Sequence, residues 1–260
     1  PPQRRIVLRV GANADAGSES TLVEITGTDA GSRFASVATR LFEVIQNLVR
    51  EKLRAPVLLQ VVTPQDGEGA LYAALAAMLN TARLENSYLF TQLIALPEGA
   101  PMADILSQEA SRLTTRQVRY LDGRRYELQH AELPASKLPA LPWRADGVYL
   151  ITGGAGAIGL TFANEIRQQA PSATIILCGR SPSAPNLAGV IYRQLDVADT
   201  GAVQRVIGTL CDEYGGLTGV LHSAGALHDS YLLKKTRDEF EAVLGPKVRG
   251  CVNLDLATHS

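Results

Sequence analysis

Hydrophobic positions along the chain fall into two alternating patterns, and each pattern predicts a different element. Short apolar runs rich in β-branched residues predict strands, whereas apolar positions three or four residues apart predict amphipathic helices. Residues 57–62 are apolar enough to form a strand that is covered on both faces. Between residues 37 and 49 the apolar positions share one face of a predicted helix. The alternation predicts a layered α/β fold.

Residues 1 to about 132 repeat this alternation several times. Strands are expected at residues 5–10, 22–25, 57–62 and 90–96, and helices at residues 37–49, 71–79 and 103–113. A hairpin is expected over residues 118–130, because Asp122-Gly123 favours a tight turn between two strands.

The alternation starts again at Val148. Strands are expected at residues 148–152, 174–178, 190–195 and 219–222, and helices at residues 160–169 and 200–214. Right-handed crossovers would place these strands side by side in one parallel sheet with helices on both faces. Thr236 and Glu239 fit a capping box that begins a further helix, and Pro246 suits the first turn of the last one.

A connector over residues 132–147 separates the two halves. It holds three prolines and no hydrophobic periodicity, which indicates a stiff extended segment. We therefore expect one domain over residues 1–143 and a second over residues 144–260. Trp143 is expected to pack the connector onto one of these domains rather than to stack on a ligand.

The strand that begins at Val148 ends in a glycine-rich turn that opens directly into a helix. The turn and the start of the helix read Thr152-Gly153-Gly154-Ala155-Gly156-Ala157-Ile158-Gly159. In the dinucleotide-binding pattern the first spaced glycine, Gly154, turns the chain; Gly156 admits a pyrophosphate, and Gly159 lets the helix pack closely. The free N–H groups at the start of the helix face the anion. Gly153, Gly154, Ala155, Gly156, Ile158 and Gly159 are therefore candidate cofactor-binding residues.

The corresponding junction of the first half carries no such glycine pattern. Val62 is followed by Thr63-Pro64-Gln65-Asp66-Gly67-Glu68-Gly69, where the proline removes a donor and the carboxylates repel phosphate. We therefore expect two tandem Rossmann-like subdomains, of which the first binds no cofactor and has a structural role.

Residues at the ends of the later strands indicate which nicotinamide cofactor binds. NAD-binding chains carry an acidic residue at the end of the second strand, but this chain has Gly179-Arg180-Ser181. The Arg180 guanidinium and the Ser181 hydroxyl suit a 2′-phosphate, which favours NADPH; the alternative is that Arg180 is a solvated surface residue. Asp196-Val197 and Ser223-Ala224-Gly225 follow the next two strands, where they could bracket the adenine and the nicotinamide ribose or form structural turns.

Composition excludes several other classes of function. The net charge of -1 gives no reason to expect a nucleic acid or an anionic membrane as a partner. The three cysteines, Cys178, Cys211 and Cys251, have neither disulfide nor zinc-site spacing, so no metal is expected. With no signal peptide and no membrane-spanning run, a cytoplasmic protein is the default expectation.

Several motifs together are similar to one family. They are the glycine turn, Gly179-Arg180-Ser181, Asp196-Val197, His222-Ser223-Ala224-Gly225 and Pro246-Lys247-Val248-Arg249-Gly250. They resemble the ketoreductase domains of modular polyketide synthases, which are extended short-chain dehydrogenases/reductases. The resemblance covers most of the chain, because these domains also carry a truncated, cofactor-free, Rossmann-like structural subdomain ahead of the catalytic one. One stretch of the first half is similar to part of that subdomain and favours synthases whose acyltransferase acts in trans: Thr81-Ala82-Arg83-Leu84-Glu85-Asn86.

The resemblance implies NADPH-dependent reduction of a β-ketoacyl group on an acyl carrier protein, next to other synthase domains. Lys247 falls on the family's catalytic lysine, although a helix-surface lysine is the alternative. Leu227-His228-Asp229 falls on the Leu-x-Asp of B-type reductases, which implies that Asp229 steers the acyl chain and that the product is the D-alcohol. Asp229 could equally cap a turn. His228 departs from the more common Asp at that position.

The family's catalytic Ser, Tyr and Asn have no counterpart in the sequence. Tyr231 and Lys235 have the spacing of a simple reductase pair, but they precede the expected position, so we interpret that spacing as coincidence. We expect residues 1–260 to be an inactive fragment of a larger ketoreductase that still binds NADPH. The alternatives are a non-catalytic structural module that organises its neighbours and, with less support, a free-standing dehydrogenase.

Overall fold

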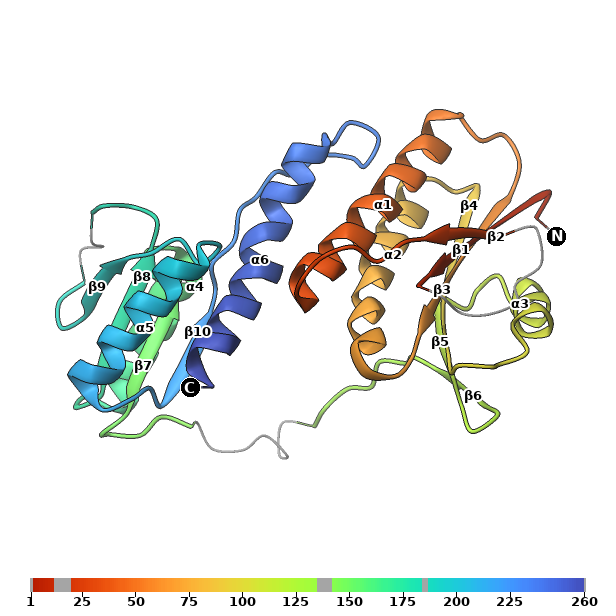
Figure 1. Ribbon diagram of the computed structural model, residues 1–260. Helices are drawn as coiled ribbons and strands as arrows, with labels where there is room; N and C mark the ends of the chain where they lie inside the picture. The colour runs from red at the N-terminus through yellow and green to blue at the C-terminus, as the bar shows by residue number, and fades with distance from the viewer. Residues whose placement is uncertain (1, 12–19, 135–141, 184–186, 260) are drawn as a thin grey trace. The chain divides into compact units, whose positions relative to one another are not determined.

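A computed structural model describes residues 2–11, 20–134, 142–183 and 187–259. The chain forms two compact units. Unit 1 comprises Pro1–Glu132 and Asp229–Phe240, and unit 2 comprises Leu133–His228 and Glu241–Ser260. Each unit contains its own sheet and its own helices (Figure 1).

Unit 1 is built on a six-stranded sheet with the order β2-β1-β3-β4-β5-β6. Its strands are β1 (Arg4–Val10), β2 (Ser20–Val23), β3 (Val57–Pro64), β4 (Leu89–Leu96), β5 (Gln117–Leu121) and β6 (Arg124–Glu127). All neighbouring strands are parallel except the β5–β6 hairpin. Asp122 and Gly123 connect this hairpin with positive φ angles of 51° and 71°, as the tight turn predicted from the sequence requires.

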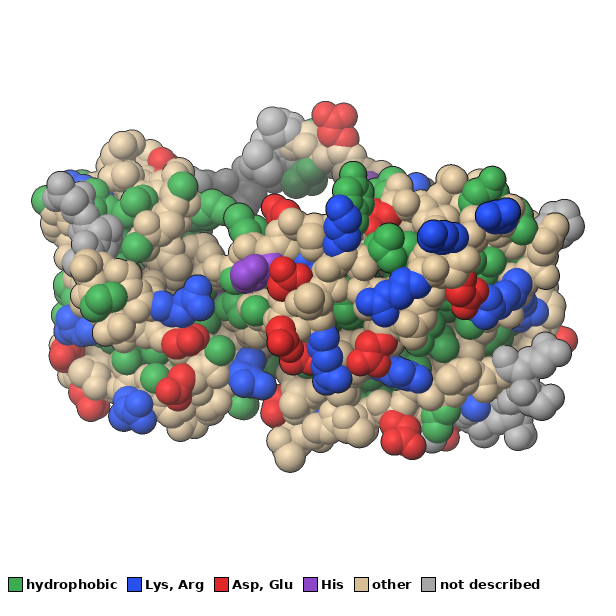
Figure 2. All heavy atoms as spheres, turned by 90° about the horizontal axis from the view of Figure 1, so that it is seen from above, with side chains coloured by type: hydrophobic (Ala, Val, Ile, Leu, Met, Phe, Trp, Pro, Cys, Tyr) green, Lys and Arg blue, Asp and Glu red, His purple; other side chains and the backbone are tan. Residues whose placement is uncertain are grey.

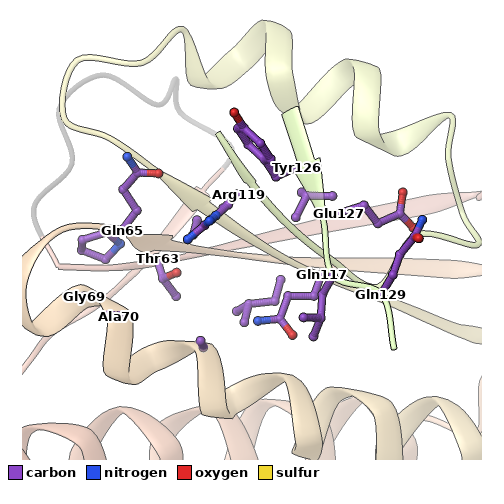
Figure 3. Close-up of a pocket in the computed structure, with 15 residues that line it drawn as sticks. Thr63, Gln65, Gly69, Ala70, Gln117, Arg119, Tyr126, Glu127 and Gln129 are labelled. Carbon is purple, nitrogen blue, oxygen red and sulfur yellow. The ribbon is translucent and has the colours of Figure 1, made fainter. Parts of the chain in front are cut away.

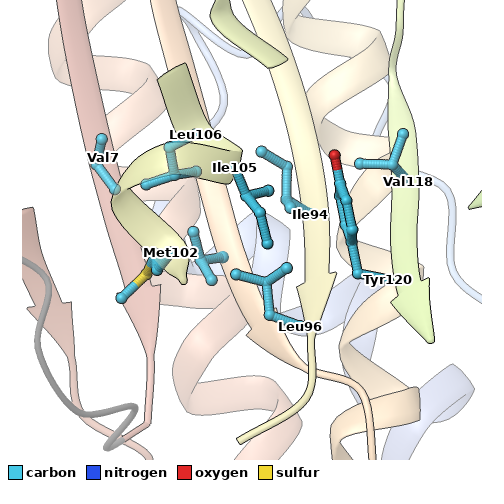
Figure 4. Packing of buried hydrophobic residues seen from close by; sticks show 9 residues of the cluster. Val7, Ile94, Leu96, Met102, Ile105, Leu106, Val118 and Tyr120 are labelled. Carbon is cyan, nitrogen blue, oxygen red and sulfur yellow. The ribbon is translucent and has the colours of Figure 1, made fainter. Parts of the chain in front are cut away.

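Helices cover both faces of this sheet. They are α1 (Ala30–Arg50), the 3-10 helix η1 (Gly67–Ala74), α2 (Leu75–Glu85) and α3 (Met102–Ala110). Helix α3 packs on one face through the cluster in Figure 4, where Met102, Ile105 and Leu106 meet apolar side chains of β3, β4 and β5. Helix α2 packs on the other face, where Thr91 donates to the Leu79 carbonyl at 3.0 Å.

The single helix expected at residues 71–79 was wrong in detail, because a 3-10 turn precedes α2. The tight turn lies against the end of β3: a Cβ atom on Gly69 would stand 2.5 Å from the Pro64 carbonyl oxygen. This close approach favours the narrower 3-10 geometry at the start of the segment.

Buried polar side chains fasten α3 to the sheet of unit 1. Gln60 donates to the Gln92 side chain at 2.8 Å and to the Leu106 carbonyl at 3.0 Å, and Gln92 donates to the Glu109 carbonyl at 2.8 Å. The Glu109 carboxylate is fully buried and accepts hydrogen bonds from Tyr120, Arg112 and Arg125. Burial raises the pKa of Glu109, but these hydrogen bonds outweigh it and leave the pKa below its usual value.

The Asp229–Phe240 segment of unit 1 comes from late in the chain. Gln46 of α1 donates to the carbonyls of Leu232 and Lys235 at 3.0 and 2.7 Å. Phe240 stacks on Phe42, with ring centroids 4.7 Å apart. The expected division at residues 143/144 did not include this returning segment, which also holds Tyr231 and Lys235.

Unit 2 contains a four-stranded parallel sheet with the order β10-β7-β8-β9. Its strands are β7 (Val148–Thr152), β8 (Thr174–Gly179), β9 (Ile191–Gln194) and β10 (Gly219–His222). Its helices are α4 (Ala157–Gln169), α5 (Thr200–Tyr214) and the part of α6 (Arg237–Thr258) from Glu241 onward. Helix α4 packs on one face, and α5 with α6 on the other. The predicted α/β class, with Rossmann-like parallel sheets and helices on both faces, is confirmed.

Helix α6 differs from the prediction. Its start is the expected capping box, in which Glu239 N–H donates to the Thr236 hydroxyl at 3.2 Å and Thr236 N–H donates to the Glu239 carboxylate at 2.8 Å. Pro246, however, lies inside one continuous helix rather than in the first turn of another. Tertiary contacts hold the helix beyond the proline, because the buried Asn253 donates to the Val197 carbonyl at 2.9 Å.

Trp143 packs the end of the connector onto unit 2, as expected. Its ring meets the Tyr149 ring edge-on at 5.4 Å, and Arg144 N–H donates to the Tyr149 hydroxyl at 2.7 Å. The lower-numbered connector residues 135–141 lie outside the described residues. None of the helices in the described ranges is long and apolar enough to cross a bilayer. Acidic and basic side chains lie interspersed on the face shown in Figure 2.

Candidate functional site

The glycine turn after β7 is tightly packed, and its first glycine makes the turn. Gly153 has a φ angle of +64°, and a Cβ atom there would stand 2.7 Å from both Ala224 N and Ser223 O. The turning role expected of Gly154 therefore belongs to Gly153. Gly154 instead allows close packing on β8, since a Cβ atom there would stand 2.7 Å from the Leu177 Cβ.

The turn leads into the N-terminus of α4, where Gly156 is the N-cap. A Cβ atom on Gly159 would stand 2.7 Å from Gly154 Cα, which confirms that this glycine allows the close approach of helix and turn. Ala155, Gly156 and Ile158 are exposed, so the end of the turn and the start of α4 lie at the surface. The N–H groups of Gly154 and Gly156 donate to the carbonyls of Cys178 and Gly153 at 2.9 Å, so an anion would meet the other N–H groups of this segment. Such a terminus suits an anion.

A cavity of about 290 Å³ lies beside this turn at the carboxyl ends of the strands of unit 2. It is lined by Gly153, Gly179, Arg180, Leu195, Asp196, Val197, Ala198, Ala224, Gly225, Glu241, Ala242, Gly245 and Pro246. Six candidate residues thus meet around one space: Gly153, Arg180, Asp196, Val197, Ala224 and Gly225. The other candidates, Gly154, Ala155, Gly156, Ile158, Gly159, Ser181, Ser223, Asp229 and Lys247, are not part of this lining.

Strand β9 braces the loop that carries Arg180. The Tyr192 hydroxyl donates to the Ser181 carbonyl at 2.8 Å, and the Gln194 amide donates to the Arg180 carbonyl at 2.9 Å. A Cβ atom on Gly179 would stand 2.9 Å from the Tyr192 oxygen, so this position favours glycine. Nothing in the spacing of Tyr192 and Gln194 marks a bond to a loop more than ten residues away, so the sequence did not predict their role.

Asp196 and Val197 have different environments. Asp196 is exposed, and its carboxylate accepts the Ala198 N–H at 2.9 Å, which fixes the turn after β9. Val197 is buried against α6, where a Cβ atom on Gly250 would stand 2.8 Å from Val197 Cγ2. Both residues line the cavity, but each also has a structural role: Asp196 fixes a turn, and Val197 packs against α6.

The residues after β10 bond back to the last residue of β7. The Ser223 hydroxyl donates to the Thr152 carbonyl at 2.6 Å, so it is turned toward the backbone. His222 lies between two elements: its Nδ1 is 2.7 Å from the Thr152 hydroxyl, and its Nε2 is 2.9 Å from the Pro246 carbonyl. His222 belongs to the motif His222-Ser223-Ala224-Gly225, but the motif alone did not predict these two contacts. Its place directly before Ser-Ala-Gly at a strand end was the available signal.

Lys247 is exposed, and its side chain lies along Gly225. A Cβ atom on Gly225 would stand 3.1 Å from Lys247 Cε and 3.4 Å from Nζ. Any larger residue at position 225 would therefore press against the ammonium group. Asp229 is exposed and belongs to unit 1.

A second and larger cavity, of about 610 Å³, lies in unit 1. In Figure 3 Thr63 and Gln65 reach it from the end of β3, and Arg119 and Tyr126 reach it from the β5–β6 hairpin. The guanidinium of Arg119 lies over the Tyr126 ring, 5.6 Å from its centroid. No glycine turn followed by an α-helix N-terminus opens onto this cavity among the residues that line it. The smaller cavity of unit 2 is therefore the one suited to a dinucleotide.

Neither the Cys178 thiol nor a metal site offers competing chemistry among the described residues. Burial raises the pKa of Cys178 to about 12, so its thiol is not a nucleophile at neutral pH. All three cysteines are free. Within the described ranges no group of His, Cys, Asp and Glu could hold a metal ion.

Known proteins are similar to this chain in sequence and in fold. Residues 147–260 match the family model of the KR domain. The chain is 38% identical over 241 residues to the polyketide synthase PksL of Bacillus subtilis, which covers 87% of this chain and 5% of that protein. It is 35% identical over 258 residues to the polyketide synthase PksN of the same organism, which covers 93% of this chain and 5% of that protein. The chain thus spans about one twentieth of these relatives.

Solved structures resemble both units together. A ketoreductase domain from the bacillaene assembly line matches with a TM-score of 0.87 and 29% identity, over 99% of this chain and 67% of that chain. An A-type ketoreductase from a modular polyketide synthase, at 22% identity and a TM-score of 0.70, shares the fold. By its family match, its relatives and its architecture, the chain belongs to the ketoreductase domains of polyketide synthases, within the short-chain dehydrogenase/reductase class of oxidoreductases.

Proposed function

We propose that this chain contributes to the NADPH-dependent reduction of a β-ketoacyl group, carried on an acyl carrier protein, to a β-hydroxyacyl group. The observation that carries the proposal is the meeting of Gly153 and Arg180 on one cavity. The N–H groups at the start of α4 suit a diphosphate, and the planar guanidinium suits a further phosphate on the ribose. In this proposal unit 2 binds the cofactor, and residues 1–143 have a structural role.

The cofactor-binding residues divide into four places. The turn from Gly153 to Gly159 would hold the diphosphate, Arg180 and Ser181 would hold the 2′-phosphate, and Asp196 and Val197 would border the adenine. Ala224 and Gly225 would border the nicotinamide ribose. Bound there, NADPH would supply the hydride for the β-carbon of the ketone. The strand-end location agrees with the general position of ligands in open α/β sheets.

Lys247 would act at the ribose end of the cavity. Its ammonium lies against Gly225, which follows Ala224 in the lining. A positive charge at this place would bond a ribose hydroxyl and lower the pKa of a nearby acid that protonates the new alkoxide. By its resemblance to the B-type motif, Asp229 would steer the acyl chain and direct the product to the D-configuration. The neighbouring domains of the synthase would deliver the carrier protein.

The test is a change of cofactor preference in Arg180→Ala. We expect the Kd for NADPH, measured by cofactor fluorescence, to rise about tenfold to hundredfold, because a charge-assisted contact is lost. The Kd for NADH should change by less than about twofold. Arg119→Ala is the matched control, since Arg119 is an exposed arginine that lines the cavity of unit 1. Equal losses for both cofactors would remove the role assigned to Arg180.

Turnover is measured separately with a diketide thioester. We expect residues 1–260 to bind NADPH without oxidising it in the presence of this substrate. Steady NADPH oxidation would show that this chain carries a complete reductase site. Absence of NADPH binding to the unsubstituted chain would overturn the cofactor proposal itself and favour a purely structural module.

A further inference from the structure

His222 joins three elements of unit 2 through its two ring nitrogens. It is the last residue of β10; Nδ1 is 2.7 Å from the hydroxyl of Thr152, the last residue of β7. Nε2 is 2.9 Å from the carbonyl of Pro246 in α6. Thr152 directly precedes Gly153 of the glycine turn, and Pro246 directly precedes Lys247. The imidazole thus connects the strand that leads into the glycine turn with the helix that carries Lys247.

The partners determine which nitrogen carries the proton. A carbonyl oxygen only accepts, so Nε2 must be the donor to Pro246. In the neutral ring Nδ1 is then an acceptor, and the Thr152 hydroxyl donates to it. The Thr152 oxygen in turn lies 3.4 Å from Ala224 N–H. The result is a directed chain of polar contacts from Ala224 through Thr152 and His222 to Pro246.

Charge and burial keep this ring neutral. Burial lowers the pKa of His222 below its usual value; the bond to Pro246 opposes this effect, and the positive charge of Lys247 adds to it. Lys247 is the titratable group that acts on the ring. The Nε2–H tautomer therefore agrees with both the hydrogen-bond partners and the electrostatics.

Helix α6 needs an external anchor at this point. Pro246 has no N–H and cannot donate to the Ala242 carbonyl, so the helix lacks one of its own bonds there. His222 holds the same turn from outside, at the Pro246 carbonyl. One turn further on, a Cβ atom on Gly250 would stand 3.3 Å from His222 Cε1, so ring and helix are in close contact.

We propose that His222 is a positioning residue that fixes Lys247 relative to the glycine turn. It does so by holding the Pro246 carbonyl while Gly225 leaves room for the lysine side chain. The inference rests on the role proposed for Lys247. Its chemistry is a neutral imidazole with a defined tautomer, and the ring itself contacts neither substrate nor cofactor.

Two substitutions separate the two contacts of the His222 bridge, the one to Thr152 and the one to Pro246. His222→Gln can place an amide N–H near the position of Nε2 and keep the bond to Pro246. His222→Asn is too short to reach Pro246, although it keeps a polar group beside Thr152. His130→Asn, at an exposed histidine of unit 1, is the control. The variants are made in the full synthase protein that carries this chain, and both NADPH affinity and turnover are measured.

We expect His222→Asn to lower kcat about tenfold while the Kd for NADPH changes by less than about threefold. His222→Gln should restore kcat to within about threefold of the unsubstituted protein. The proposal would be overturned if the unsubstituted protein, His222→Asn and His222→Gln had equal kcat values. It would also be overturned if the two His222 variants lost kcat equally. A role in folding alone would lower the melting temperature without this division between kcat and Kd.

A spectroscopic measurement tests the bridge without relying on activity. Long-range proton–nitrogen NMR spectra of residues 1–260 should show a neutral His222 ring protonated at Nε2 at pH 7. An Nδ1–H tautomer or a charged ring would overturn the inference, whichever way the variants behave. If the unsubstituted protein neither binds NADPH nor reduces the substrate, the proposed function fails, while the tautomer still decides whether the bridge exists.

Discussion

The two units carry similar sheets, but they differ where a strand passes into the following helix. In unit 2 the junction after β7 holds Gly153, whose φ angle is +64° and whose place is enclosed by the backbone of residues 223 and 224. In unit 1 the junction after β3 holds Gly67, with a φ angle of +55° and open space around it. Glu68 of that junction is bound by Arg33 at 2.6 and 2.8 Å. The comparison teaches that similar strand-to-helix junctions differ in the packing of a few turn residues, and a phosphate site is proposed only for the junction in unit 2.

The units also place their polar contacts differently. In unit 1 the buried groups Gln60, Gln92 and Glu109 lie between the sheet and α3, where they hold an element in place. In unit 2 His222 and Thr152 lie at the strand ends, beside the cavity. The same kind of interaction therefore serves stability in one unit and site geometry in the other.

The largest expected effect comes from adding one methyl group to each junction. Gly153→Ala should abolish measurable NADPH binding, because the new Cβ atom would collide with the backbone of residues 223 and 224 at a positive φ angle. Gly67→Ala has a similar φ angle but open space, so it should cost only about 1–2 kcal/mol of unit 1 stability. Cofactor titration and thermal unfolding of both variants check this contrast. Equal effects on binding would contradict it.

A smaller effect is expected from the buried carboxylate of unit 1. Glu109→Gln should lower the free energy of unfolding by about 3 kcal/mol, because it removes one partner from a buried ionic group. NADPH affinity should not change. Glu51→Gln is the control: its contact with Arg4 is exposed on both sides, so the loss should stay below about 1 kcal/mol. Denaturant unfolding measures both, and a change in NADPH affinity with Glu109→Gln would break the division between the units.

A more modest change is expected at the brace from β9. Tyr192→Phe removes the bond to the Ser181 carbonyl, which loosens the loop that carries Arg180. The Kd for NADPH should rise about threefold, as for the loss of one neutral hydrogen bond, and the Kd for NADH should not rise. Tyr126→Phe, at the cavity of unit 1, is the matched control. A parallel rise for both cofactors would mean that Tyr192 supports the sheet rather than the selectivity.

The smallest effect is a difference in acid sensitivity. The pKa of His222 is lowered in the folded state, so its contribution is present above the unfolded value of about 6.5 and is lost as the pH falls below it. The pKa of Glu109 is also lowered, so that contribution is lost only below about 4.5. Unit 2 should therefore lose a little stability, below about 1 kcal/mol, between pH 7 and 5. Trp143, the one tryptophan of the sequence, reports unit 2 by fluorescence. His222→Gln should remove this dependence.

Much of the fold follows from local patterns in the sequence. The strands, the hairpin at Asp122-Gly123 and the capping box at Thr236 are set by neighbouring residues, and the structure confirms them. Local reasoning was wrong about Pro246, because contacts with distant residues hold α6 at the proline and beyond it. It also did not foresee that residues 229–240 pack on unit 1, since Gln46 provides bonds across more than 180 positions.

The candidate site was predictable where residues act directly, through their own backbone or their own side chain. The glycine turn and the motif around Arg180 could be recognised, and the structure brings Gly153 and Arg180 to one cavity. Residues that act through another residue gave no comparable signal. Tyr192 and Gln194 hold carbonyls of a distant loop, and the role of His222 depends on two partners that only the fold brings together.

The three cysteines differ in exposure, so the rate at which a thiol reagent labels Cys178 can report local opening of the chain. Cys251 is exposed and Cys211 is partly exposed, whereas Cys178 is buried in β8, two residues before Arg180. Thiol reagents attack the ionised sulfur, so Cys178 reacts only when its strand opens to water. The labelling rate of Cys178 therefore measures how often β8, the strand that leads to Arg180, opens locally. A ligand that binds only the closed form would slow this labelling.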